Sequence, residues 1–330
     1  MFDPRSPYQR RMWHYESDRP LSVAQLIAAG SLDTRTAALL WLLVERHRSI
    51  IVSGPTDPTP GVGKTTTLNA LLGFLPIGST MVYTMGMFED FSFVSEVDPA
   101  TTCVLANEVS NHLRIYMWSQ PARKLLRLPG DGFAIATSCH ADTIDDVLDM
   151  LRGDLRLTAE DVRRLGVIIN IGLVGANWPP QRRFLSVNYV RPDGGADQPY
   201  GVSLANLSSW DQRRGEFTPA APDVVAELAT LLEMTPEDME AALQRRIERL
   251  ESLSAGRGAT VQVMRQSVDE LYIEEHGLPP HLADAINSAD EAVVEDVDED
   301  EYAYADEDDE DDEDDDDDDE DEVEDEDENR

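Results

Sequence analysis

The sequence contains few cysteines and few lysines. Its two cysteines, Cys103 and Cys139, are too few for a disulfide framework or a zinc site. A chain without a disulfide framework is typical of a reducing cytoplasm. Lys64 and Lys124 are the only lysines, although the chain has 27 basic residues. Nearly all of its positive charge is therefore carried by arginine.

Long hydrophobic runs are also missing. The longest apolar run, from Ala37 to Val44, has eight residues, whereas about 20 are needed to cross a bilayer. The first 20 residues are polar and rich in arginine, without the apolar segment of a signal peptide. We therefore expect no membrane insertion and a cytoplasmic location.

Negative charge, by contrast, is in large excess and is unevenly placed. Residues 291–330 contain 29 acidic residues and one arginine, a net charge of −28 out of −39 for the whole chain. The run from Asp306 to Glu322 has no apolar side chain to bury, and we expect it to be disordered. We favour a solubilising or halophile-type extension, with recruitment of a basic partner as the alternative. Either way, the tail should repel nucleic acid and anionic membrane surfaces.

A glycine-rich turn lies between an apolar run and a helical pattern. The run Ile50–Ser53 leads into the turn, and an apolar-periodic segment, residues 68–75, follows it. Strand, turn and helix in this order predict a phosphate-binding loop, in which backbone N–H groups surround an anion. Lys64 would reach the β- and γ-phosphates, and the Thr65 hydroxyl would hold Mg²⁺ as the predicted metal ligand. The predicted nucleotide-binding residues are Gly54, Gly61, Val62, Gly63, Lys64, Thr65 and Thr66.

The spacing of this loop departs from the usual pattern at residues 57–60, Asp-Pro-Thr-Pro. Without these four residues, the sequence from Gly54 to Thr65 matches a phosphate-binding loop in full. We interpret them as an insertion that bulges outward, because the glycines, lysine and threonine of the motif are retained. A site tuned away from rapid hydrolysis is one alternative, and a Gly/Pro surface turn that precedes a lysine by chance is another.

Short apolar runs alternate with helical patterns through the first 173 residues. The expected strands are 49–53, 80–85, 101–106, 133–137 and 166–173, and the expected helices are 20–30, 31–47, 65–74, 111–128, 143–152 and 158–165. This alternation predicts an α/β fold with a mostly parallel sheet. Residues 183–190 and 200–204 predict an appended β-hairpin, and residues 222–272 predict C-terminal helices. The predicted domains are an N-terminal arm (1–19), a core (20–220), a C-terminal helical region (221–289) and a disordered polyacidic tail (290–330).

Polar residues follow three of the predicted strands. They are Glu89 and Asp90 after the second, Glu108 after the third and His140 after the fourth. The carboxyl ends of strands in a doubly wound sheet share one crevice, so these side chains should converge on the phosphates. There a carboxylate can orient water or hydrated Mg²⁺, and a histidine can donate to developing charge. The alternatives are a polar loop for Glu89 and Asp90, a solvated helix start for Glu108 and a packed or capping role for His140.

With these motifs the sequence resembles the secretion-type ATPase superfamily, the motors of type II and type IV secretion, type IV pili and archaeal surface filaments. Glu89-Asp90 resembles the Asp box of the family, Glu108-Val109 its Walker B glutamate, and Thr137-Ser-Cys-His140-Ala its His box. The resemblance covers residues 20–272 without the large N-terminal domain of most members. It is closest to the archaeal and tight-adherence-pilus branches.

The resemblance implies a RecA-like core that hydrolyses ATP with Mg²⁺. Glu108 would position or activate water, Glu89 and Asp90 would support the metal and its water, and His140 would sense the γ-phosphate. It also implies a homo-oligomer, a hexamer in the family, that drives a membrane platform protein of a secretion or pilus system. The protein would be cytoplasmic and could reach the inner face of the membrane through that partner.

Three departures from the family pattern support an alternative function. Asn107, Ser110 and Phe133 stand where the family has glycine, arginine and histidine. A nucleotide-binding regulatory or partner subunit with weak or no turnover would tolerate these changes. A scaffold that recruits basic partners through its tail is a third hypothesis.

A ring that pumps DNA is a further alternative, which the charge of the chain disfavours. The sequence has no lysine cluster and is strongly acidic, so we expect no direct binding of nucleic acid. Arginine pairs occur at 163–164, 182–183, 213–214 and 245–246. We expect these pairs to form solvated or intersubunit ion pairs.

Overall fold

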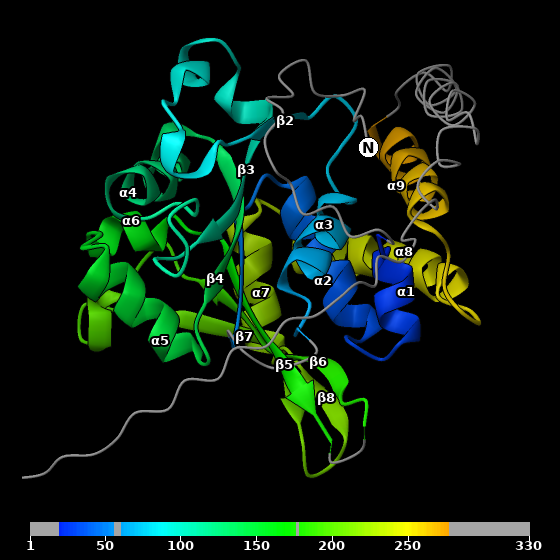
Figure 1. Ribbon diagram of the computed structural model, residues 1–330. Helices are drawn as coiled ribbons and strands as arrows, with labels where there is room; N and C mark the ends of the chain where they lie inside the picture. The colour runs from blue at the N-terminus through cyan, green and yellow to red at the C-terminus, as the bar shows by residue number, and fades with distance from the viewer. Residues whose placement is uncertain (1–19, 56–60, 176–177, 277–330) are drawn as a thin grey trace, which may run out of the picture.

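The computed structural model describes residues 20–55, 61–175 and 178–276, whose arrangement is shown in Figure 1. They form an eight-stranded sheet in the order β2-β3-β4-β1-β5-β6-β7-β8. Strands β1 to β5 pair in parallel, and β5 to β8 pair antiparallel. The predicted α/β class with a mostly parallel sheet is confirmed. The strands are β1 (Ile50–Gly54), β2 (Thr80–Tyr83), β3 (Thr102–Val109), β4 (Ala134–His140), β5 (Val167–Val174), β6 (Gln181–Val190), β7 (Leu204–Asp211) and β8 (Glu216–Pro219).

Helices cover both faces of the sheet (Figure 1). One face packs against α4 (Ser119–Arg127), α5 (Ile144–Asp149) and α6 (Ala159–Arg163). The other packs against α1 (Val23–Ala28), α2 (Thr34–Glu45), α3 (Lys64–Leu72), α7 (Pro222–Leu231), α8 (Pro236–Leu253) and α9 (Val261–His276). Shorter turns are the 3₁₀ segments Gly86–Phe88, Ser92–Ser95, Pro99–Thr101, Leu128–Asp131 and Pro199–Gly201, and a π-helical turn at Met150–Asp154.

The central strands are apolar on both faces because each face is covered. In β1, Ile50 and Val52 belong to the core cluster on the α2 side, whereas Ile51 belongs to the cluster on the α4 side. All three side chains are buried. A parallel strand buried on both faces reads as a continuous hydrophobic run, which is why the sequence located β1 to β5.

Side-chain caps fix where several helices begin. Asp33 accepts from the Thr36 backbone N–H and starts α2, and Thr235 accepts from Asp238 and starts α8. Ser22, Thr143 and Thr158 form capping boxes at α1, α5 and α6. Such residues satisfy N–H groups that the first helical turn leaves free.

The helix predicted over residues 111–128 is wrong in its first half. Residues 110–118 form a loop, and α4 begins at Ser119. A continuous helix would place Pro121 in its interior, where proline cannot donate to the carbonyl four residues earlier. That carbonyl, on Met117, instead accepts from the Ser110 backbone N–H at 3.1 Å. Residues 110–117 are therefore a closed loop at the end of β3.

The predicted hairpin is also displaced. Its first strand is β6, but residues 199–201 form a 3₁₀ turn with Tyr200 at a φ of 68°. The partner strand, β7, therefore begins at Leu204 rather than at Tyr200, and β8 adds a further antiparallel strand. The sheet extends by three strands on the side of β5.

The predicted domain boundaries remain predictions. The arm (1–19), the insertion (57–60) and the acidic tail (290–330) lie outside the described residues. On both sides of residue 220, side chains belong to the same hydrophobic core cluster, which includes Val23 and Leu271. In the described ranges, no helix combines the length and the hydropathy needed to cross a bilayer.

Candidate functional site

The glycine-rich loop starts at the end of β1 and ends at α3. Gly54 lies against β5, where a side-chain Cβ would be 2.7 Å from the Ile171 carbonyl oxygen. Gly63 precedes α3 with a φ of 93°, a conformation that glycine adopts without steric cost. Backbone geometry thus requires glycine at both positions, and the first turn of α3 offers backbone N–H groups to an anion.

Lys64, His140 and Glu108 are in direct contact and form what we call the strand-end cluster. The Lys64 ammonium lies 3.0 Å from His140 Nδ1, and it also donates to the Gly54 and Pro55 carbonyl oxygens at 3.4 and 3.3 Å. His140 Nε2 lies 2.5 Å from Glu108 Oε1. The structure therefore brings together three of the residues that the sequence predicted to converge.

These contacts assign the proton on the His140 ring. An ammonium can only donate, so the neutral imidazole accepts at Nδ1 from Lys64 and carries its proton at Nε2. That nitrogen faces Glu108 Oε1 in a close ion-pair contact. A chain of close contacts thus runs from the first residue of α3, through the end of β4, to the end of β3.

Desolvation shifts the pKa values of this cluster toward the neutral forms. Burial raises the pKa of Glu108, although Lys64, a hydrogen bond from Ser110 and His112 oppose the shift. Burial also lowers the pKa of Lys64, opposed by Glu108, Cys139 and Asp142. Within the cluster, the neighbouring charges therefore do not fully offset the cost of burying Lys64 and Glu108 in their charged forms. This is expected of a site that receives a charged ligand.

Strand order explains how these residues meet. β4 lies between β3 and β1, and His140 is paired with Gly54 across β4 and β1. The pairing of β3 with β4 is irregular between Ala106 and Val109, and Ser138 Oγ donates to the Asn107 carbonyl oxygen at 2.7 Å. This irregularity occurs at the segment that carries Glu108.

Glu89 and Asp90 organise their own loop. The buried Glu89 carboxylate accepts from the Met85 and Phe91 backbone N–H groups, both at 2.8 Å. Asp90 is exposed and accepts from the Ser92 backbone N–H at 2.8 Å. These contacts give both acids a structural task after β2, and their catalytic role remains a prediction.

The other predicted nucleotide-binding residues lie in or beside the first turn of α3. Val62 is buried in the core, whereas Thr65 and Thr66 are half-buried. Gly61 is exposed, and its carbonyl oxygen accepts from Arg182 Nε at 3.0 Å. A cation, N–H groups, hydroxyls and a carboxylate in one place form a donor set that fits a polyphosphate with Mg²⁺.

Arg182 is a site residue that the sequence analysis missed. It comes from β6, and its Cδ would lie 3.4 Å from a Cβ placed on Gly63. Its side chain therefore crosses the two glycines that precede Lys64. The sequence analysis predicted a solvated or intersubunit ion pair at 182–183. The pairing of β6 with β5, which brings Arg182 to the loop, cannot be seen in the sequence pattern.

His112 was also missed. Its ring lies edge-on to the His140 ring, with 5.5 Å between centroids, and its backbone N–H donates to Ser110 Oγ at 3.0 Å. His112 is exposed. The prediction of a helix over residues 111–128 concealed this contact, because the loop places His112 over the site.

Asn170 is a third residue that sequence reasoning overlooked. It is buried in β5, and its Nδ2 donates to Ser53 Oγ and to the Asp142 carbonyl oxygen, both at 3.0 Å. It therefore ties the end of β1 to the segment that follows His140. The sequence did contain one indication of this role, because Asn170 is the one polar residue in the apolar run 167–171.

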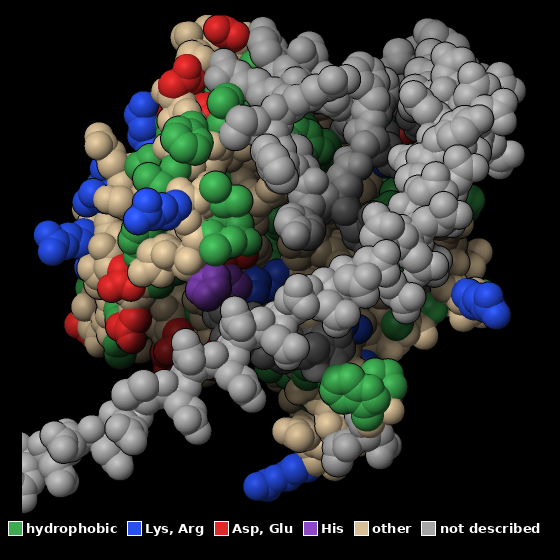
Figure 2. All heavy atoms as spheres, in the orientation of Figure 1, with side chains coloured by type: hydrophobic (Ala, Val, Ile, Leu, Met, Phe, Trp, Pro, Cys, Tyr) green, Lys and Arg blue, Asp and Glu red, His purple; other side chains and the backbone are tan. Residues whose placement is uncertain are grey.

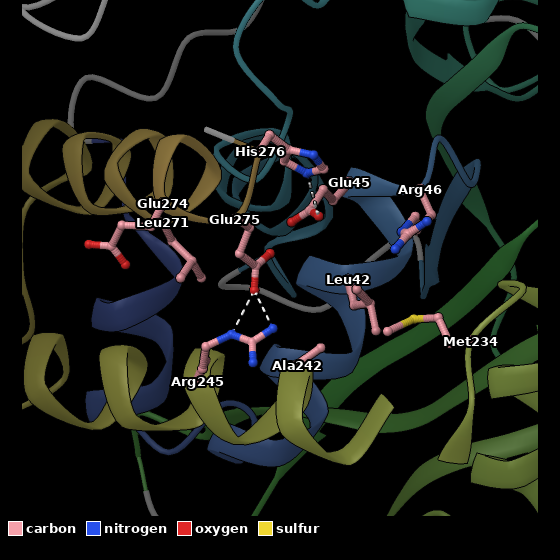
Figure 3. A pocket seen from close by; sticks show the side chains of 10 residues that line it. All are labelled: Leu42, Glu45, Arg46, Met234, Ala242, Arg245, Leu271, Glu274, Glu275 and His276. Atoms are coloured by element: carbon pink, nitrogen blue, oxygen red, sulfur yellow. Dashed lines mark hydrogen bonds and ion pairs between the residues drawn. The ribbon is translucent and has the colours of Figure 1, made fainter. Parts of the chain in front are cut away.

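A second group of charges, the helix cluster, lies between α2, α8 and α9. Its members are Glu45, Arg245, Arg246, Glu275 and His276. Figure 3 shows Arg245 directed at Glu275, and His276 beside Glu45. The fully buried Arg246 pairs with Glu45 at 2.5 Å and Glu275 at 2.7 Å. The predicted solvated pair at 245–246 is therefore wrong for Arg246.

In the described part of the chain, the helix cluster includes a group of side chains close enough to share a metal ion. One ligand atom each of Glu45, Glu275 and His276 lies within 4.8 Å of the others. Arg246 pairs with both carboxylates, and Arg245 pairs with Glu275 at 2.8 Å. Two arginines already balance these acids, so the group is explained as an ion-pair network.

Comparisons with known proteins give partial matches. No family model matches the sequence. An uncharacterized protein of Methanocaldococcus jannaschii is 49% identical over 59 residues, which are 18% of this chain and 10% of that protein. The VirB11 ATPase of the Brucella suis type IV secretion system, solved in complex with sulphate, is 20% identical with a TM-score of 0.33. That alignment covers 53% of this chain and 61% of the VirB11 chain. The chain thus spans about a tenth of its curated relative and less than two thirds of this structure.

Proposed function

We propose that this protein binds ATP with Mg²⁺ and hydrolyses it as the motor of a type II or type IV secretion or pilus-like system. The observation that supports hydrolysis most directly is the contact chain Lys64–His140–Glu108 beside the N-terminus of α3. A phosphate-binding loop alone would indicate nucleotide binding. A carboxylate joined to its lysine through a histidine adds a group that can accept a proton.

Each member of the strand-end cluster has a distinct task in this proposal. Lys64 neutralises charge on the β- and γ-phosphates. Glu108 orients water for in-line attack and accepts its proton, a task suited to a carboxyl whose pKa burial has raised. His140 holds Glu108 through Nε2 and detects whether a phosphate has drawn Lys64 away from Nδ1. Loss of that contact would leave Nδ1 able to bind a proton, and the ring protonated there could donate to the γ-phosphate.

The metal would be held by the first turn of α3. The Thr65 hydroxyl is the ligand that this chain would offer to Mg²⁺, which would offset charge on the phosphates. Glu89 and Asp90 support the surrounding water in this proposal, and Gly54, Gly61 and Gly63 keep the backbone close to the phosphates.

The working form in this proposal is a cytoplasmic homo-oligomer, a hexamer by resemblance. Its partner is a membrane platform protein, which gives it a peripheral place at the inner face of the membrane. The charge of −39 supports the expectation that no nucleic acid is bound directly.

Phosphate release by the purified full chain tests the proposal. With Mg²⁺ and ATP, we expect Lys64→Ala and Glu108→Gln each to lower turnover by about 10²- to 10³-fold, the range seen when a transition-state contact is lost. The matched controls are Lys124→Ala, the only other lysine, and Glu96→Gln, which lies in an exposed segment. Equal losses in the controls and the site variants would contradict the proposal.

A nucleotide-binding regulatory or partner subunit is the second candidate, and one observation favours it. The Glu108 carboxylate is held by His140 and by a hydrogen bond from Ser110. A carboxylate held on both sides is poorly placed to accept a proton from water. Tight Mg-ATP binding by the parent chain, abolished in Lys64→Ala and accompanied by background turnover, would establish this function instead.

A further inference from the structure

Two loops beside the strand-end cluster join into one surface. Gly86–Phe88 follows β2, and residues 110–117 follow β3. The Met87 backbone N–H donates to the Ile115 carbonyl oxygen at 3.3 Å. A Cβ on Gly86 would overlap that same carbonyl, and Gly86 has a φ of 59°. The loops are therefore packed directly on one another.

The second loop is also closed at its base. The Ser110 backbone N–H donates to the Met117 carbonyl oxygen, and the Met117 backbone N–H donates to that of Glu108, both at 3.1 Å. The Met117 side chain is fully buried. The loop is anchored at both ends, so the side chains at its tip form a defined surface.

That surface is apolar. Met87, Phe88, Leu113 and Ile115, which we call the loop patch, are 45%, 69%, 46% and 57% exposed. They are four of the seven exposed large hydrophobic side chains in the described part of the chain. A cluster of this kind marks an interaction site more often than single exposed apolar residues do.

The loop patch contains one exposed arginine, Arg114, and the exposed Asp90 lies two residues beyond Phe88. Residues 85–88 and 109–118 contain no Asp or Glu, and Arg114 and His112 are exposed between the apolar side chains. On the face that Figure 2 shows, hydrophobic side chains reach the surface next to Lys and Arg side chains. A complementary ligand would be both acidic and apolar.

One segment of this chain has that composition. Residues 291–304 read Glu-Ala-Val-Val-Glu-Asp-Val-Asp-Glu-Asp-Glu-Tyr-Ala-Tyr, with seven acidic residues among valines and tyrosines. The run that follows, residues 306–322, is acidic at every position. The acidic tail therefore consists of a mixed segment and a purely charged one, both outside the described residues.

We propose that residues 291–304 bind the loop patch of their own chain. Their valines and tyrosines cover the apolar side chains, and their carboxylates lie near Arg114. Residues 277–290 link the segment to His276, and these 14 residues reach up to about 50 Å when extended. The tether keeps the segment at high local concentration, which favours the chain's own tail over that of another copy.

Hydrogen–deuterium exchange of the full chain tests whether the patch is covered. The tail variant replaces the apolar residues of the segment by serine and keeps every charge: Val293, Val294, Val297, Tyr302 and Tyr304. We expect faster exchange at residues 86–88 and 110–117 in this variant than in the parent, at every protein concentration. Unchanged exchange would overturn the proposal. Slower exchange that grows with concentration in the parent would assign the patch to a second copy instead.

Peptide binding to the tail variant separates apolar docking from charge attraction. The probe is a fluorescent peptide of residues 289–304, and the control is residues 306–322, which are acidic without apolar side chains. We expect the probe to bind more tightly than the control, and Ile115→Ser to weaken it about tenfold, as burial of one large apolar side chain implies. Val263→Ser changes another exposed apolar side chain, 47% exposed and at the start of α9, and should have no effect.

Salt dependence completes the test. Binding of the probe should persist at 1 M NaCl, where surface charges are screened within about 3 Å, and Arg114→Gln should weaken it modestly at low salt. Equal binding of the two peptides, lost together in high salt, would overturn docking of the apolar residues. Equal binding of the probe to the tail variant with and without Ile115→Ser would overturn the assignment of the loop patch as the docking surface. None of these readouts depends on ATP hydrolysis.

Discussion

The strand-end cluster and the helix cluster both contain buried charge, but they balance it in opposite ways. In the helix cluster, burial opposes ionisation, yet the pairs with Glu275 and Glu45 raise the pKa of Arg246. Arg246 and Arg245 likewise lower the pKa of Glu275 against the effect of burial. In the strand-end cluster, burial outweighs the partners, lowering the pKa of Lys64 and raising that of Glu108.

This difference distinguishes a structural ion-pair network from a site whose charged side chains are only partly balanced by one another. The helix cluster satisfies its charges internally and joins α2, α8 and α9. The strand-end cluster lacks enough compensation, and a polyphosphate with its metal would supply charge of both signs. The comparison also explains why the helix cluster, although it contains a possible metal-ligand group, is the poorer candidate for a functional site.

The largest effect is expected from Arg246→Met in the helix cluster. This change leaves Glu45 and Glu275 partly buried opposite an apolar side chain, and breaking a buried pair from one side costs about 3–5 kcal/mol. Urea unfolding monitored by circular dichroism measures the loss. The control is Arg249→Met, because Arg249 pairs with exposed acids, and its loss should stay below about 1 kcal/mol. Similar values for both variants would contradict the comparison.

Lys64→Met should have the reverse profile. Under the proposed function it abolishes nearly all turnover, but its free energy of unfolding should be unchanged or higher, because burial disfavours the Lys64 charge. The same urea unfolding assay, without nucleotide, measures this quantity. A decrease of more than about 2 kcal/mol, larger than a typical hydrogen-bond contribution, would show that Lys64 is balanced as tightly as Arg246.

Glu108→Gln should change the pH dependence of stability. The folded-state pKa of Glu108 is raised, so the folded protein binds a proton that the unfolded chain has released. The contribution of Glu108 to the free energy of unfolding is present below the ordinary glutamate pKa. It is lost as the pH rises through the pKa that Glu108 has in the folded protein. The variant should therefore gain unfolding free energy relative to the parent as pH increases from 5 to 8. A free-energy difference between variant and parent that narrows over this range would mean that Lys64, Ser110 and His112 outweigh burial.

The smallest effect is expected from Arg182→Gln. Arg182 lies across the glycines of the loop and is largely exposed, so its loss should weaken Mg-ATP affinity about three- to tenfold. Isothermal titration calorimetry measures the affinity. Arg183→Gln is the matched control, because Arg183 stacks on Trp210 at 5.0 Å. Stronger loss in the control would remove Arg182 from the site.

Sequence patterns located β1 to β5 and the start of α3 because these depend on neighbouring residues. Buried parallel strands are continuous apolar runs, and Gly63-Lys64 marks a left-handed residue before a helix. The loop at 110–118 was mistaken for helix because its apolar spacing is helical, whereas Pro121 and the bond from Ser110 to Met117 decide otherwise. The position of Glu108 at the end of β3 was predicted, but the irregular pairing that accompanies it was not.

The sequence by itself determined the class of fold, the glycine-rich loop between β1 and α3 and the order of the polar segments, since each follows from spacing along the chain. Tertiary structure decided which side chains meet. Arg182 reaches the loop from β6, the His112 ring lies edge-on to the His140 ring, and the fully buried Arg246 bridges two helices. These contacts join residues far apart in the chain, and their burial depends on how the sheet and its helices pack.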